Sequence, residues 1–363
     1  MTDGAHSLPG PMPGPMPRTV DWSADRLVVI DQTLLPDHLA LVELRTIDDV
    51  IDALQRLVVR GAPAIGVTGA LGVALATVIA RRDGHDGDWV RAQAARLRAA
   101  RPTAVNLAWG VDRVLARLAT IDDDPADPSP PGAEAAISFA VEMLDADVAT
   151  NRAMARLGAD HVRSIVPDPA RVRVLTHCNA GGLACVEWGT ALGIVRALHD
   201  DGHLHQVFAD ETRPLLQGAR LTAWELARMG VDHRVVVDGA AASVIARGMV
   251  DVVIVGADRV AANGDVANKI GTYPLALAAA RAGIPFVVAA PESTLDARTA
   301  TGDDIDIETR DDDEVLVWRG QRIAPVESRA LNLAFDVTPF DLVTALVTET
   351  RVVRLAAGHR LQV

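Results

Sequence analysis

The sequence predicts an α/β protein in which a mainly helical N-terminal domain is followed by a Rossmann-like, largely parallel α/β domain. Residues 49–165 carry apolar side chains at helical spacing in several long segments. After Pro169, short β-branched runs alternate with helical segments. This alternation implies right-handed crossovers and a parallel sheet covered on both faces. We therefore expect the helical domain over residues 21–165 and the Rossmann-like catalytic domain over residues 166–363.

The first domain is preceded by a segment that cannot build a core. Residues 10–17 read Gly-Pro-Met-Pro-Gly-Pro-Met-Pro, and this density of proline and glycine predicts a disordered tail over residues 1–20. Asp and Pro crowd residues 122–132 and predict a surface loop. The helices predicted between and after these breaks span residues 49–59, 61–80, 89–100, 107–118 and 134–165.

The segment 61–80 has no charged residue, so a membrane span must be weighed against a buried helix. It is rich in Gly, Ala and Thr and is therefore only weakly hydrophobic. We expect a tightly packed helix in the core and no membrane partner.

The second domain shows the strand and helix signals in alternation. The predicted strands span residues 172–175, 205–208, 234–237, 252–255, 286–289 and 315–318. The predicted helices span residues 183–198, 221–229, 241–247 and 275–282.

Composition excludes several classes of function. The net charge of −13 supplies no general basic surface for nucleic acid. Two cysteines are too few for a disulfide framework, and with no basic, apolar leader at the N-terminus we expect a reducing, cytoplasmic setting. The chain has no Walker A, dinucleotide-binding or HExxH pattern. These absences disfavour a nicotinamide-dependent dehydrogenase and a zinc hydrolase, and we expect no metal site.

Ligands of open parallel sheets bind beyond the carboxyl ends of the strands, and polar residues gather there in this sequence. Cys178 follows the first strand, and a helix predicted just after Gly181-Gly182 would favour its thiolate. The alternative is a small buried residue, which is the reading we favour for Cys185. Asp258 follows a fully apolar strand. Burial there would raise its pKa for general-acid work, unless it caps a helix or pairs with Arg259.

A phosphate cradle is suggested by Arg60-Gly61-Ala62 at the start of the Ala/Gly-rich helix. Arg101 and Lys269 could add two further cations, although a surface position is the commoner fate of each. Asn263-Gly264-Asp265 predicts a tight turn.

Six motifs together resemble the methylthioribose-1-phosphate isomerase family. They are Arg60 to Gly66 (RGAPAIG), Arg101 to Leu107 (RPTAVNL), Thr176 to Asn179 (THCN), Asp210 to Thr222 (DETRPLLQGARLT), Gly256 to Tyr273 (GADRVAANGDVANKIGTY) and Ala334 to Pro339 (AFDVTP). They run in family order over nearly the whole chain. The resemblance implies an aldose–ketose isomerase of methionine salvage that converts 5-methylthioribose 1-phosphate to 5-methylthioribulose 1-phosphate. It also implies a homodimer without a required cofactor.

The resemblance assigns roles by position. It implies Cys178 and Asp258 as the catalytic pair. It implies substrate binding by seven further residues: Arg60, Gly61, Ala62, Arg101, Gln217, Asn268 and Lys269.

The sequence leaves the substrate, the function class and the role of Cys178 open. The chain departs from the family pattern at 180–182, 239–241 and 326–333, which leaves 5-deoxyribose 1-phosphate and ribose 1,5-bisphosphate as alternative substrates. The same fold also serves non-catalytic regulatory subunits of a translation-initiation exchange factor. For the enzyme, Asp258 would protonate the ring oxygen, and Cys178 would either accept the C2 proton or stabilise a hydride shift from C2 to C1.

Overall fold

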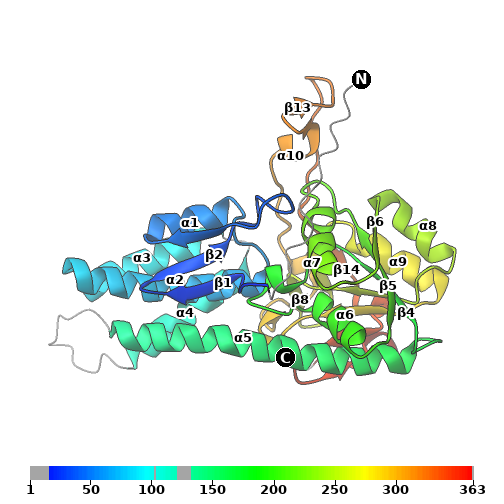
Figure 1. Ribbon diagram of the computed structural model, residues 1–363, viewed down its shortest axis with the longest axis horizontal. Helices are drawn as coiled ribbons and strands as arrows, with labels where there is room; N and C mark the ends of the chain where they lie inside the picture. Colours follow the sequence, from blue (N-terminus) through cyan, green and yellow to red (C-terminus); the bar gives the residue numbers. More distant parts are fainter. Residues whose placement is uncertain (1–15, 102–103, 121–131, 362–363) are drawn as a thin grey trace.

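The computed structural model describes residues 16–101, 104–120 and 132–361. A helical region and an α/β region lie side by side, and the long helix α5 runs along both of them (Figure 1). The expected tail falls mostly on residues 1–15, outside the described part, as do most of the predicted loop 122–132 and residues 102–103. The tail does not extend to residue 20, however, because Thr19 is fully buried and Val20 begins the first strand.

The helical region is built around one apolar core. Its helices are α1 (Ile47–Gln55), α2 (Ala62–Asp83), α3 (Gly87–Ala99), α4 (Val105–Ala119) and α5 (Ala133–Ile165). α1 begins at a capping box in which Thr46 and Asp49 satisfy each other's backbone N–H groups. α5 is one continuous helix, and its residues Met154 and Val162 pack in the core of the α/β region while Ala140 and Leu144 pack in the helical core.

α2 is the central helix of this region. By length and composition it could cross a membrane, but 89% of its most apolar window is buried inside the protein. α3, α4 and α5 pack around it. The expectation of a buried core helix is therefore confirmed.

A small antiparallel sheet in the helical region was not predicted. It pairs β1 (Val20–Ser23), β2 (Arg26–Ile30) and β3 (Leu41–Leu44) in that order. Val20, Leu27 and Val29 point into the same core as the helices. The short apolar and β-branched run Leu-Val-Val-Ile in β2 was the available signal.

The α/β region contains a seven-stranded sheet with the order β16-β15-β10-β7-β4-β5-β6 among the described residues. Its strands are β4 (Val172–Thr176), β5 (Leu204–Asp210), β6 (His233–Val236), β7 (Val252–Val255), β10 (Phe286–Ala289), β15 (Ala345–Val347) and β16 (Val352–Val353). All neighbours are parallel except β15 and β16. Five of the six predicted strands are therefore confirmed.

Helices cover both faces of this sheet. α5, α6 (Ala191–Asp200) and α7 (Ala223–Arg228) pack on the face that carries Val174 and Ile254. α8 (Ala241–Ala246) and α9 (Thr272–Ala282) pack on the face that carries Leu175 and Val253. Because successive side chains of a strand point to opposite faces, one apolar run serves both cores.

Two predicted elements were wrong. Residues 315–318 do not enter the main sheet: α10 (Asp313–Leu316) leads into a hairpin of β12 (Val317–Trp318) and β13 (Gln321–Arg322) that projects from the molecule (Figure 1). The helix predicted at 183–198 begins only at Ala191. Residues 182–184 form a 3-10 turn, and Trp188 and Gly189 both have positive φ.

A second, four-stranded sheet was also missed. Its order is β11 (Leu295–Asp296), β8 (Arg259–Ala261), β9 (Val266–Lys269) and β14 (Phe335–Thr338). β8 and β9 are joined by the predicted turn Asn263-Gly264-Asp265, which lies between the apolar strands β8 and β9. An Asn-Gly pair between apolar residues is a strong hairpin signal.

Candidate active site

The site lies at the carboxyl ends of two neighbouring central strands. β4 was the first strand of the sheet along the chain; β5 and β6 extend it on one side, and β7, β10 and β15 on the other. β4 and β7 therefore flank the point where the strand order reverses, which is where open α/β sheets bind ligands. Cys178 is the second residue after the end of β4, and Asp258 is the third residue after the end of β7.

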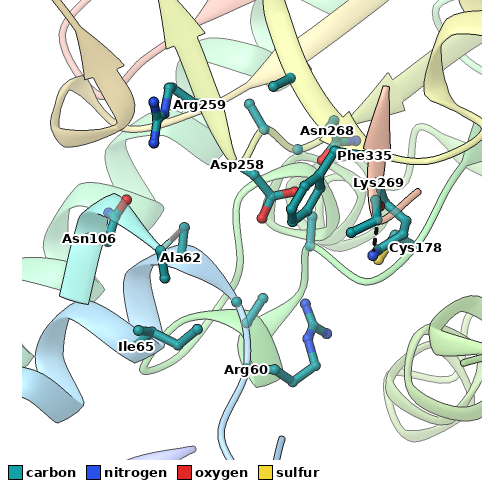
Figure 2. A pocket seen from close by; sticks show the side chains of 18 of the residues that line it. Arg60, Ala62, Ile65, Asn106, Cys178, Asp258, Arg259, Asn268, Lys269 and Phe335 are labelled. Carbon is teal, nitrogen blue, oxygen red and sulfur yellow. Dashed lines mark hydrogen bonds between the residues drawn. The ribbon is translucent and has the colours of Figure 1, made fainter. Parts of the chain in front are cut away.

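All the site residues predicted from the sequence line one cavity between the helical region and the sheet edge. They are Arg60, Gly61, Ala62, Arg101, Cys178, Gln217, Asp258, Asn268 and Lys269. Figure 2 shows the Asp258 carboxyl and the Cys178 sulfur on the same side of the cavity, with the Arg60 guanidinium below them. The structure thus brings together residues almost 210 positions apart in the sequence, from Arg60 to Lys269.

The start of α2 forms one wall of this cavity. Gly61 adopts φ +93°, and a Cβ on it would lie 2.4 Å from the backbone of Ala184, so only glycine fits this close approach. Among the described residues, no side chain caps the N-terminus of α2. Pro63 has no N–H, so the free backbone donors before the first intrahelical bond, from Ile65 N to the Gly61 carbonyl, are few, but the positive end of the dipole faces the same place. The phosphate cradle at this helix start stays a prediction.

Cys178 is held in a strained backbone conformation with φ +60°. Its N–H donates to Thr212 Oγ1 at 2.8 Å, and its carbonyl accepts from Thr222 Oγ1 at 2.6 Å. Burial raises the pKa of the Cys178 thiol, while the charges of Arg60 and Lys269 oppose this shift. The expectation that a helix start would favour the thiolate was therefore wrong, because no helix begins at Gly181-Gly182.

Asp258 has the electrostatic environment expected from its position. Burial raises the pKa of its carboxyl, and the positive charges of Lys269, Arg60 and Arg101 counteract part of the rise. Arg259 does not compete for it, because its guanidinium lies 3.8 Å from Asp296 Oδ2. A carboxyl with a raised pKa in a cavity is suited to donate a proton.

Polar groups for a hydroxylated ligand come from two further elements. Gln217 is buried, and its Oε1 has no hydrogen-bond partner in the described part of the chain. Asn268 donates to Thr272 Oγ1 at 3.0 Å, and Lys269 Nζ donates to the Ala334 carbonyl at 2.9 Å (Figure 2). A buried acceptor without a donor usually awaits a ligand or water.

The helical region also gives the cavity an apolar side. Leu57, Ile65 and Val105 line it there. On the opposite side, Arg310 is held by Glu308 at 2.9 Å and by Glu314. The charge of Arg310 is thus offset by carboxylates.

A buried histidine behind Cys178 was missed by sequence reasoning. His177 Nε2 donates to the Ile270 carbonyl at 2.8 Å, and Nδ1 lies 2.9 Å from Asp210 Oδ2. Burial lowers the pKa of His177, but the hydrogen bond and charge of Asp210 outweigh this and the net shift is upward. The His-Cys pair at a strand end, with Asp210 ending the next strand, was the signal that could have found it.

The same histidine belongs to the group of side chains that could hold a metal. Ligand atoms of His177, Asp210 and Asp238 lie within 4.8 Å of one another. Asp238, however, already accepts the backbone N–H groups of Thr212 and Arg213 at 2.8 and 2.7 Å. Asp238, one of the three possible metal ligands, is therefore already engaged in holding the loop after β5.

Comparison with known proteins agrees with this geometry. Residues 58–354 match the initiation factor 2 subunit family. The methylthioribose-1-phosphate isomerase of Desulforudis audaxviator is 48% identical, with 94% of this chain and 95% of that protein aligned. That of Anaeromyxobacter dehalogenans is 52% identical, with 93% and 94% aligned.

The chain belongs to the methylthioribose-1-phosphate isomerases of the initiation factor 2 subunit family.

Another relative of this family is longer than the chain. A probable bifunctional isomerase/dehydratase of Nocardia farcinica is 53% identical over 92% of this chain, which spans 59% of that protein.

Two solved structures of the family share the fold closely. The 5-methylthioribose 1-phosphate isomerase of Pyrococcus horikoshii superimposes with a TM-score of 0.83 at 40% identity, covering 93% of both chains. A protein of A. fulgidus described as translation initiation factor eIF-2B, subunit delta, superimposes with a TM-score of 0.80 at 41% identity, covering 93% of this chain and 96% of that one. The fold alone therefore does not separate the enzymes of the family from its translation factors.

Proposed function

We propose that this chain is an aldose–ketose isomerase that converts 5-methylthioribose 1-phosphate to 5-methylthioribulose 1-phosphate in methionine salvage. The observation that carries the proposal is the meeting of a thiol and a carboxyl of raised pKa in one cavity that also holds an uncapped helix start. A regulatory protein has no need of this pair.

The proposed substrate explains why both groups are needed. Phosphate on O1 locks the sugar as a cyclic acetal, so no free aldehyde exists to enolise. Asp258 would donate a proton to the ring oxygen as the ring opens, and a carboxyl whose pKa is raised by burial is suited to this step. The hydrogen on C2 must then reach C1 while the C2 hydroxyl loses its proton.

Cys178 would manage the hydrogen at C2 by one of two routes. In the first, the Cys178 thiolate takes the C2 proton and returns it to C1; burial disfavours this thiolate, and the charges of Arg60 and Lys269 offset part of that effect. In the second, the hydrogen moves directly as a hydride, and Cys178 stabilises the transition state. Turnover of substrate deuterated at C2 separates them: deuterium lost to solvent supports the first route, and complete retention supports the second.

The remaining site residues would bind the substrate. We assign the phosphate to Arg60, the start of α2 and Lys269, with Arg101 as a further cation in the cavity. Gln217 Oε1 would accept a hydrogen bond from a sugar hydroxyl, because it is buried without a donor. Asn268 would orient the sugar from β9.

The apolar side of the cavity favours an uncharged group on C5. Leu57, Ile65 and Val105 would surround it, while Arg310 and Arg259 are engaged by carboxylates and offer little to a second phosphate. This favours methylthio or hydrogen over phosphate at C5. A small apolar group changes binding only modestly, so a measurement must separate those two.

One experiment tests the function directly: kcat/KM on 5-methylthioribose 1-phosphate, 5-deoxyribose 1-phosphate and ribose 1,5-bisphosphate. We expect the first to be the best substrate and the bisphosphate the worst. No turnover of any of them would overturn the proposal in favour of a regulatory protein, such as the translation factor that the A. fulgidus relative is described as.

We further propose that the enzyme is a cytoplasmic homodimer. The resemblance to its family implies a dimer, and the projecting hairpin region carries apolar residues that are largely exposed, with Val326 at 81% and Leu331 at 80%. Light scattering of the purified protein would report twice the chain mass of 38.4 kDa.

A further inference from the structure

The loop that follows Cys178 is wrapped around a buried carboxylate. Glu225 of α7 is only 5% exposed. It accepts hydrogen bonds from Gly182 N at 2.7 Å, from Leu183 N at 3.3 Å and from Asn179 Nδ2 at 2.8 Å. A Cβ on Gly181 would lie 2.3 Å from Glu225 Oε1, so the glycine allows the backbone to close on the carboxylate.

The same loop holds Arg60 on its other side. Arg60 Nη1 donates to Asn179 Oδ1 at 2.6 Å, and Nη2 donates to the Asn179 carbonyl at 2.7 Å. A single asparagine side chain therefore joins the buried carboxylate to the guanidinium. Glu225 itself stands behind the loop and is not part of the cavity wall.

We propose that Glu225 is a positioning residue that fixes Arg60 through Asn179 for binding the substrate phosphate. The inference rests on the proposed function, which makes Arg60 a phosphate ligand. It assigns Glu225 a role in affinity, and it explains why a carboxylate is buried where a neutral side chain would be easier to desolvate.

The physical basis is a directional hydrogen-bond chain. The carboxylate draws the Asn179 amide hydrogens toward itself, which strengthens Asn179 Oδ1 as an acceptor for Arg60. Two of the guanidinium N–H groups are thereby fixed in place, and the rotamer entropy of the arginine is lost before the ligand arrives. Without the carboxylate, Asn179 Nδ2 keeps only Thr222 Oγ1 at 3.2 Å as an acceptor, and the side-chain half of the link to Arg60 is held less firmly, while the Asn179 carbonyl still accepts from Arg60 at 2.7 Å.

The test compares two isosteric variants of acids that contact the same loop, the buried Glu225 and the half-buried Asp147. Glu225→Gln keeps the shape but removes the charge and one acceptor. Asp147→Asn is the matched control, because Asp147 accepts the Val186 N–H at 2.8 Å from α5 without contacting Asn179 or Arg60. KM and kcat are measured for each, together with the Kd of inorganic phosphate by calorimetry.

For Glu225→Gln we expect kcat/KM to fall about tenfold to hundredfold, mainly through KM. The Kd of inorganic phosphate should rise by a similar factor. Asp147→Asn should change the melting temperature while leaving KM and the phosphate Kd close to the wild-type values. A purely structural role for Glu225 would instead make the two variants behave alike.

A double mutant tests whether the effect passes through the arginine. In an Arg60→Ala background, Glu225→Gln should change KM by less than about twofold, because the group it positions is gone. A full additional loss there would overturn the proposal. Asn179→Ala, which removes the link and keeps the carboxylate, should reproduce the Glu225→Gln effect and serves if the first variant does not fold.

Failure of this inference differs from failure of the proposed function. If the wild type turns over none of the sugar phosphates, the function is wrong, and the phosphate Kd still tests the link from Glu225 to Arg60. If the wild type is active and Glu225→Gln keeps its KM and phosphate Kd, the inference alone is wrong.

Discussion

The two regions of the molecule contribute different things to the same cavity. The α/β region supplies the proposed reactive groups, Cys178 and Asp258, at the ends of adjacent strands. The helical region supplies a helix start, the guanidinia of Arg60 and Arg101, and an apolar wall. Both sets of groups meet only because α2 and the loop after β4 pack closely, through Gly61 against Ala184.

This division teaches how one fold can host both enzymes and regulatory proteins. The helical wall can bind a phosphorylated ligand without any chemistry, whereas catalysis requires the two strand ends as well. Variants of the two reactive groups, Cys178 and Asp258, should therefore act on kcat, and variants of the groups that bind the phosphate, such as Arg60, should act on KM. Single variants of each group test this separation of kcat effects from KM effects.

The largest effect is expected from removing the thiol. Cys178→Ala should lower kcat by about 10²–10⁴-fold with little change in KM, because the group acts on the reacting hydrogen and not on the phosphate. Steady-state kinetics measure both constants.

Cys185 provides the matched control. Its sulfur is fully buried and lies 3.6 Å from Asn151 Oδ1. Cys185→Ala should cost stability and leave kcat near the wild-type value. Equal losses of kcat in the two alanine variants would contradict the assignment of Cys178.

An intermediate effect is expected on the helical side. Arg60→Lys keeps the charge but cannot form both hydrogen bonds to Asn179. We expect KM to rise about tenfold, with a smaller change in kcat. Arg113→Lys, which alters an exposed arginine stacked on Trp109 away from the cavity, is the control and should change neither constant. A loss confined to kcat in Arg60→Lys would break the separation of roles.

The smallest effect on activity is expected from Asp147 of α5, which packs against both regions. Burial raises its pKa from 3.8 to about 7. The folded protein therefore retains a proton that the unfolded chain has lost, and the free energy of unfolding falls as pH rises between these two values. Above pH 7 this contribution no longer changes.

Denaturation of wild type and Asp147→Asn at several pH values measures this contribution. The wild type should lose roughly 1 kcal/mol per pH unit relative to the variant between pH 5 and 7. Parallel stability curves would show that Asp147 does not titrate in this window.

The sequence predicted the parts of the fold that depend on local pattern. The apolar runs at 252–255 and 286–289 are strands with those same bounds, because a strand buried on both faces must be apolar throughout. The site followed from topology: whatever comes after the central strands must face the same edge.

What could not be predicted depends on contacts between distant segments. Gly181-Gly182 looked like the start of a helix, and only the fold reveals that Glu225, more than 40 residues away, accepts the N–H groups of Gly182 and Leu183. The sequence predicted a lowered pKa for the Cys178 thiol, whereas burial raises it. This burial also comes from distant segments and cannot be seen in the local sequence. The short strands of the second sheet depend on β14, which comes from far along the chain.

Asp258→Asn offers the most direct test of the central claim that binding and chemistry are separate in this cavity. The measurement is the Kd of 5-methylthioribose 1-phosphate by calorimetry, followed by conversion of the bound sugar to the ketose by NMR. For Asp258→Asn we expect a Kd within a few-fold of the wild-type KM, and conversion of the bound sugar slowed by about 10²-fold or more. Conversion at the wild-type rate would contradict it, since the proton for the ring oxygen would then come from elsewhere.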